Sequence, residues 1–68
     1  MKVIINNQDV TVFNGARVCD AVLAFSRSSY DLMKKGRLNI TDQYGHLTSE
    51  DGALAEGQVI RIQKKTTL

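Results

Sequence analysis

A short amphipathic stretch, Arg17–Ser26, constrains the fold of this chain more than any other segment. Its apolar residues recur at i, i+3, i+4 and i+7, the spacing of one helical face; they are Val18, Ala21, Val22 and Phe25. The other strong patterns are strand-like, and a sheet with one apolar face needs a layer to cover it. We therefore expect one main helix, beginning near Ala16 or Arg17, that lies across a sheet made from both ends of the chain.

Four stretches alternate apolar and polar residues with the period of two that is typical of half-buried strands. They are residues 1–6, 9–13, 37–41 and 58–63, and Leu47 is a candidate for a very short fifth strand. The turn between the first two contains Asn6 and Asn7, which tolerate positive φ, so these strands form a hairpin. The sequence predicts an α+β fold in which a mixed, four- to five-stranded sheet packs against the main helix.

The predicted core joins the helical stripe to the inward-facing residues of the strands. These are Val3, Ile5, Val10, Val12, Leu38, Ile40, Ile60 and Ile62. Burying one such side chain contributes roughly 1.5–3 kcal/mol, which makes the set sufficient for one small core. We expect a single domain over residues 1–64 and a polar tail over residues 65–68.

Residues 28–36 contain the signals of a second, short helix. A serine is available as a cap at its start, Lys34 and Lys35 lie in its last turn, and Gly36 suits the position after its end. The same signals fit a single helical turn, so both readings stay open.

Composition limits the cellular setting. The chain has 68 residues, a net charge of +2 and one cysteine, Cys19, so no internal disulfide is possible. A small domain without disulfides fits a reducing compartment. The first apolar run, Val3–Ile5, is far too short for a membrane span or a signal peptide. We expect a cytoplasmic protein with no membrane partner.

No group of residues has the spacing of a catalytic or metal site, so we expect neither an enzyme nor a bound cofactor. Cys19 is better explained as a small packed side chain than as a reactive thiol. His46 has no second histidine or cysteine to share a metal with, which favours a surface loop histidine. The acidic residues of the second half do not have EF-hand spacing; they are Asp42, Glu50, Asp51 and Glu56.

The ends of the chain resemble the β-grasp, or ubiquitin-like, fold, and within it the small sulfur carriers of the ThiS and MoaD type. The resemblance is carried by MKVIINNQDVTVFNGARVCDAVLAF at residues 1–25 and DGALAEGQVIRIQ at residues 51–63. Those carriers end in Gly-Gly, whereas this sequence ends in Lys64-Lys65-Thr66-Thr67-Leu68 and its last glycine is Gly57. The carrier activity is therefore the least favoured function. Electron transfer by a 2Fe–2S cluster needs four thiolates, and the chain has one cysteine.

Ubiquitin-like modules bind partners on the sheet face away from the helix, and the resemblance places Ile4, Val59 and Arg61 there. An apolar residue flanked by an arginine suits a protein interface. We therefore expect a non-catalytic binding or accessory module that works through protein–protein interaction, with a larger enzyme as its partner.

An alternative interpretation of the sequence is that the chain is an RNA-binding module. Residues 26–40 together with Glu56–Ile60 resemble the S4 module, and TGS-type β-grasp domains are a further relative in fold. In this reading the basic segment from Arg27 to Arg37 meets RNA phosphates, through Arg27, Lys34, Lys35 and Arg37. The simpler explanation is a solvated helix end, where lysines complement the helix dipole.

Overall fold

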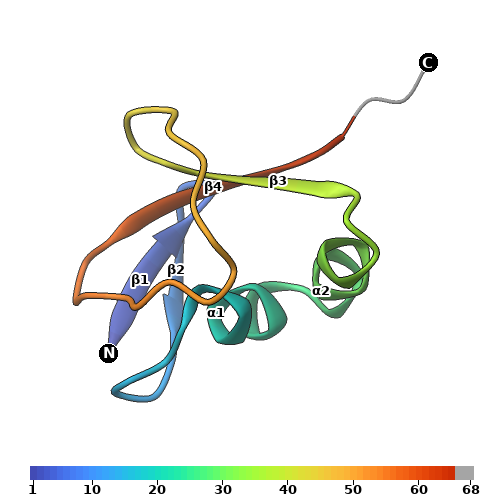
Figure 1. Ribbon diagram of the computed structural model, residues 1–68. Helices are drawn as coiled ribbons and strands as arrows, with labels where there is room; N and C mark the ends of the chain where they lie inside the picture. The colour runs from blue at the N-terminus through green and yellow to red at the C-terminus, as the bar shows by residue number, and fades with distance from the viewer. Residues whose placement is uncertain (66–68) are drawn as a thin grey trace.

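The computed structural model describes residues 1–65 and contains a four-stranded mixed sheet with two helices (Figure 1). The elements in chain order are β1 (Lys2–Ile5), β2 (Gln8–Thr11), α1 (Val18–Phe25), α2 (Arg27–Lys34), β3 (Leu38–Asp42) and β4 (Val59–Lys64). The strand order across the sheet is β2-β1-β4-β3. β1 pairs in parallel with β4, and the two outer pairs are antiparallel. The α+β class and the joining of both chain ends in one sheet are confirmed.

The first turn fixes the hairpin and also ties β1 to β4. Asn6 and Asn7 have φ of +50° and +68°, so the two-residue connection is left-handed, as tight hairpins require. The side-chain amide of Asn6 continues the hydrogen bonding of β1 to β4. Its Nδ2 donates to the Ile62 carbonyl at 3.2 Å, and its Oδ1 accepts from the Ile62 N–H at 3.0 Å. Asn6 therefore extends the central parallel pairing beyond the end of the strand.

The helical layer consists of two helices of eight residues each, which corrects the expectation of one main helix. The division occurs at Ser26, whose backbone is extended. Its N–H donates to the Val22 carbonyl at 2.9 Å, and its Oγ accepts from the Ser29 N–H at 3.2 Å. One serine thus ends α1 and caps α2. Of the two readings left open for residues 28–36, the helix is the correct one, and it begins at Arg27.

The long connection between β3 and β4 supports the start of α1. The first N–H groups of a helix have no partner within it. Here Val18 N–H donates to the Gly52 carbonyl at 3.0 Å, and Cys19 N–H donates to the Glu50 carbonyl at 2.9 Å. The same connection contains Leu47, which forms an isolated bridge with Thr41 and not a fifth strand. The sheet of the described residues therefore has four strands.

The core lies between the sheet and the two helices, which cover the same face of the sheet (Figure 1). All eight strand residues expected in the core are buried, as are Val18, Ala21 and Val22. Phe25 is half-buried at the end of α1, and Ala16 and Met33 are buried in addition to the predicted set. Of the predicted polar tail, Lys65 is exposed, and residues 66–68 lie outside the described part of the chain.

Candidate binding surfaces

The sheet face opposite the helices brings together the three residues proposed for a protein partner. Ile4 and Val59 are direct neighbours in the parallel pairing of β1 with β4, and Arg61 lies two residues further along β4. Side chains alternate across a strand, and the intervening Ile60 is buried under the helices, so these three share the opposite face. Ile4 and Val59 are half-buried and Arg61 is exposed. We call this surface the open face.

Along β4, the open face passes from the apolar Val59 to the cationic Arg61. Beyond Arg61, its positions are taken by uncharged polar residues, since Asn39 of β3 pairs with Gln63 of β4. Just past the end of that pairing, the Lys65 N–H donates to the Arg37 carbonyl at 3.0 Å. No carboxylate within residues 1–65 lies within 4.0 Å of the Arg61 guanidinium. Arg61 is therefore available to an acidic group on another molecule.

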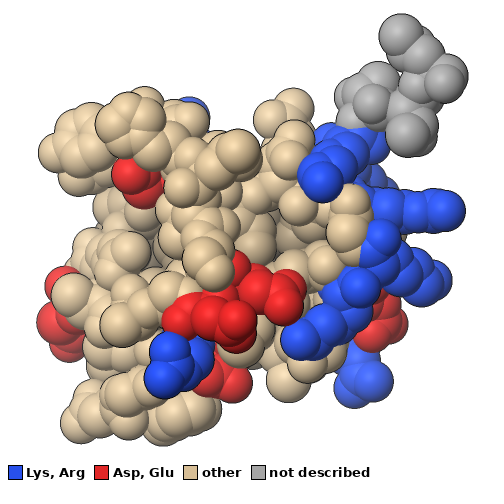
Figure 2. All heavy atoms as spheres, in the orientation of Figure 1, with Lys and Arg blue, Asp and Glu red and all other residues tan. Residues whose placement is uncertain are grey.

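A second surface, the basic end, gathers six of the nine basic residues of the chain where α2 meets the ends of β3 and β4. They are Arg27, Lys34, Lys35, Arg37, Lys64 and Lys65. Figure 2 shows most of the visible Lys and Arg side chains on one side of the molecule, and most of the visible acidic residues toward the middle and the other side. The pairing of β3 with β4 brings Lys64 opposite Leu38, and so places two lysines beside Arg37 that are distant in sequence.

Two members of the basic end have carboxylate partners. Arg27 Nε lies 3.3 Å from Asp31 Oδ1, and Lys34 Nζ lies 3.7 Å from Glu50 Oε1. Lys34 also lies over the Tyr30 ring, 5.5 Å from its centroid. The Glu50 carboxylate, followed by the Tyr30 side chain, raises the pKa of Lys34. The other four cations of this end have no carboxylate within 4.0 Å among the described residues.

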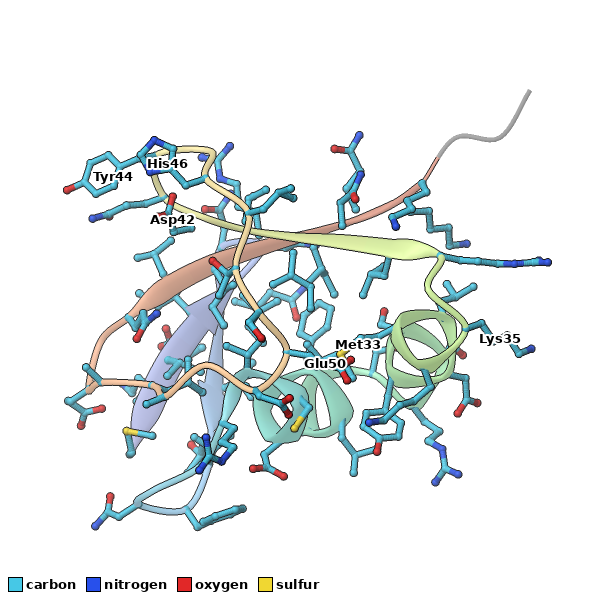
Figure 3. All side chains as sticks on the ribbon, in the orientation of Figure 1. Met33, Lys35, Asp42, Tyr44, His46 and Glu50 are labelled. Atoms are coloured by element: carbon cyan, nitrogen blue, oxygen red, sulfur yellow. The ribbon has the colours of Figure 1, made fainter. Side chains whose placement is uncertain are left out.

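Asp42 and His46 belong to a turn at the end of the sheet remote from Lys35 (Figure 3). Asp42 Oδ1 accepts from the Tyr44 N–H at 2.8 Å and from the His46 N–H at 3.0 Å. The backbone hydrogen bond from His46 is the main reason that the pKa of Asp42 is lowered. His46 Nδ1 lies 3.7 Å from Asp42 Oδ2, and its side chain is exposed. This carboxylate therefore organises a turn, and His46 lies on the surface.

The remaining chemical candidates stay apart in space. Within residues 1–65 no three His, Cys, Asp or Glu side chains are close enough to hold a metal ion together. Cys19 is a half-buried free thiol at the start of α1, where its backbone N–H already has a partner. In the same part of the chain, no helix has the length and apolar character needed to cross a membrane.

Sequence reasoning missed one surface, an apolar groove between β2 and α1. Phe13 and Leu23 border it and are 64% and 42% exposed. Phe13 lies just beyond the end of β2, and Leu23 lies off the apolar stripe of α1. The available signal was the presence of two large apolar residues that the predicted core does not use.

No family model matches the chain, and no match appears among curated proteins or solved structures. Function is therefore inferred from the surfaces of the molecule.

Proposed function

We propose that this chain is a non-catalytic binding module of the β-grasp type that recognises a protein partner through its open face. The observation that carries the proposal is the direct pairing of Ile4 with Val59 beside Arg61, on the sheet face that neither α1 nor α2 covers. An apolar pair next to an arginine has the composition of an interface centre, where Arg is enriched and Lys is depleted.

The chemistry of the open face indicates the partner. The two half-buried aliphatic side chains favour an apolar contact, and the guanidinium of Arg61 favours a carboxylate. On the β3 side of this centre, Asn39, Thr41 and Gln63 provide uncharged hydrogen-bonding groups. On the β2 side, Asp9 lies opposite Ile4 and is 3.7 Å from Lys2, so a polar rim flanks the centre on both sides. The partner we infer is a protein surface with an apolar patch flanked by Asp or Glu, and a larger enzyme remains our proposal for it.

The experiment is a tagged capture from nuclease-treated native lysate with four matched variants. Ile4→Asp and Arg61→Glu alter the open face; Leu47→Asp and Lys35→Glu introduce the same charges at exposed positions elsewhere. We expect one stoichiometric protein that binds the wild type and both controls and is lost from both open-face variants, all of which keep the wild-type circular dichroism spectrum. Retention by folded Ile4→Asp and Arg61→Glu would show that this face is not the site.

RNA binding at the basic end is the second candidate function, and a specific observation favours it. Lys64 and Lys65 stand beside Arg37 because β3 pairs with β4, so the surface available to phosphates is larger than the segment 27–37 alone provides. Four unpaired cations on one end can each neutralise a phosphate and release counterions.

The RNA reading is tested by fluorescence anisotropy with a labelled single-stranded RNA of mixed sequence. We expect affinity to fall with salt, and the log–log slope to decrease by about 0.7 for each contacting lysine that is replaced. Lys34→Glu with Lys35→Glu should weaken binding, and so should Lys64→Glu with Lys65→Glu. Lys2→Glu with Arg61→Glu, both outside the basic end, is the charge-matched control. Equal affinity for all of these proteins would rule out the basic end.

The sheet order and the central parallel pair support a β-grasp relationship, since both ends of the chain meet in the middle of the sheet. A sulfur-carrier role requires a Gly-Gly pair, and no two of the five glycines in this sequence are adjacent. We therefore keep this role as the third candidate, behind the two binding functions.

A further inference from the structure

The groove between β2 and α1 is an open, largely apolar hollow of about 500 Å³. Three of its lining residues come from β2 and the chain just after it, and three come from α1: Thr11, Val12, Phe13, Asp20, Leu23 and Ala24. Two large apolar side chains, Phe13 and Leu23, are exposed on its rim. A volume of this size is typical of sites that hold a small ligand or a few side chains.

The outer edge of β2 borders this groove and has free hydrogen-bonding groups. Met1 and Val12 exchange two backbone hydrogen bonds, at 2.9 and 2.8 Å, so they form a hydrogen-bonded pair. Such pairs alternate with non-bonded pairs along an antiparallel ladder, so the N–H and C=O groups of Asp9 and Thr11 point away from β1. No residue within 1–65 forms a hydrogen bond with these groups.

The other edge of the sheet is protected in a way that β2 is not. At β3, Thr48 N–H donates to the Ile40 carbonyl at 2.8 Å, and Asp42 N–H donates to the His46 carbonyl at 2.9 Å. The connection after β3 therefore covers that edge. An uncovered edge is a template for a further strand, and natural sheets normally block it.

We propose that the β2 edge and the adjoining groove bind an extended peptide segment of another protein, which adds to the sheet as a fifth strand beside β2. The outward N–H and C=O groups of Asp9 and Thr11 supply the main-chain hydrogen bonds. Alternate side chains of the peptide enter the groove against Phe13 and Leu23. In strand addition, the main-chain hydrogen bonds usually provide affinity and the side-chain pockets provide specificity. The groove lies on the helical side of the sheet, whereas the side chain of Asp9 lies beside Ile4 on the open face. The inference does not depend on the protein partner proposed for the open face, because it rests on the backbone groups of β2 and on the groove.

The negative charge of Asp20 at the groove indicates which charged residue the peptide contains. Asp20 lines the groove, and its carboxylate accepts a hydrogen bond from the Arg17 N–H at 2.9 Å. No Lys, Arg or His side chain of the described residues pairs with it, whereas Asp9 of β2 is paired with Lys2 at 3.7 Å. The occupant is therefore an apolar, extended segment with one Lys or Arg facing Asp20.

The test uses a defined probe, an acetylated peptide of about seven residues, a usual strand length, that alternates valine with threonine and ends in lysine. We expect titration into isotope-labelled protein to shift the amide signals of Asp9, Thr11 and Leu23, and to slow hydrogen exchange at Asp9 and Thr11 by about tenfold or more. Phe13→Ser and Leu23→Ser should each weaken the peptide about tenfold, whereas Leu47→Ser, at an exposed loop position, should not.

Two changes to the peptide make the test independent of protein folding. N-methylation of the peptide amides that face β2 should abolish binding, and N-methylation of the alternate amides should leave it unchanged. Replacing the peptide lysine by glutamate should weaken binding about two- to fivefold.

Three results would overturn the proposal. One is the absence of binding by the probe; another is binding that is indifferent to the position of N-methylation. The third is protection of Asp9 and Thr11 in the protein alone, rising with protein concentration, which would show that a second copy of this chain occupies the edge.

Discussion

The side chain of Asn6 is a critical stabilising contact, because it joins the hairpin turn to the central pairing of the sheet. It forms two hydrogen bonds with the Ile62 backbone, at 3.0 and 3.2 Å, in a partly buried setting. At about 0.5–1.5 kcal/mol for each bond, their loss in Asn6→Gly should cost about 1–3 kcal/mol. Asn6→Ala keeps a Cβ at φ +50° without the polar side chain that lets Asn adopt this conformation, so it should cost about 1–2 kcal/mol more than Asn6→Gly.

These losses are large for a chain of this size, since about 0.05–0.15 kcal/mol per residue corresponds to about 3–10 kcal/mol in total. Asn7→Gly is the matched control, because Asn7 has φ +68° but no comparable side-chain bonds. The assay is urea unfolding followed by far-ultraviolet circular dichroism, which suits a chain without tryptophan. We expect Asn7→Gly to be at least as stable as wild type, since Asn-Gly is a preferred pair for this turn, and we expect Asn6→Gly and then Asn6→Ala to be less stable. Equal stability of Asn6→Gly and Asn7→Gly would refute a stabilising role for the amide.

Three further predictions concern the core, the long connection and pH. Met33→Ala removes the buried side chain of α2 and should lower the free energy of unfolding by about 2–5 kcal/mol in the same urea assay. Gly52→Ala places a Cβ 3.1 Å from the Ser49 carbonyl oxygen and should cost about 1–3 kcal/mol; unchanged stability would mean that the connection adjusts freely. Asp42 has a lowered pKa in the folded chain, so its contribution is complete above the ordinary aspartate value of about 3.9 and is lost as pH falls through the folded value. Thermal melts in acid should therefore show a steeper loss of stability for wild type than for Asp42→Asn, and parallel curves would contradict this assignment.

The sequence predicted those features that depend on local periodicity. Alternation over residues 1–13 identified the hairpin, and the 3.6-residue spacing of Val18, Ala21 and Val22 identified the buried face of α1. Both signals are local, so they survive without knowledge of the rest of the fold.

The features that were not predicted depend on contacts between distant segments. Whether Ser26 only interrupts a helix or caps a second one is decided by the packing of α2, which buries Met33. The support of α1 by the Glu50 and Gly52 carbonyls requires the path of the long connection. In the same way, the basic end gains Lys64 and the groove forms beside Phe13 only once the strands are paired.

The most direct test of the open-face proposal is site-specific photo-crosslinking in nuclease-treated lysate. A crosslinking amino acid replaces Gln63, which is exposed and pairs with Asn39 on the open face, or Gln43, which is exposed in the turn after β3. We expect a protein adduct at Gln63 alone, competed by excess unmodified chain but not by the double variant Ile4→Asp, Arg61→Glu. Adducts of equal yield at Gln43, or competition by the double variant as effective as by wild type, would contradict binding through this face.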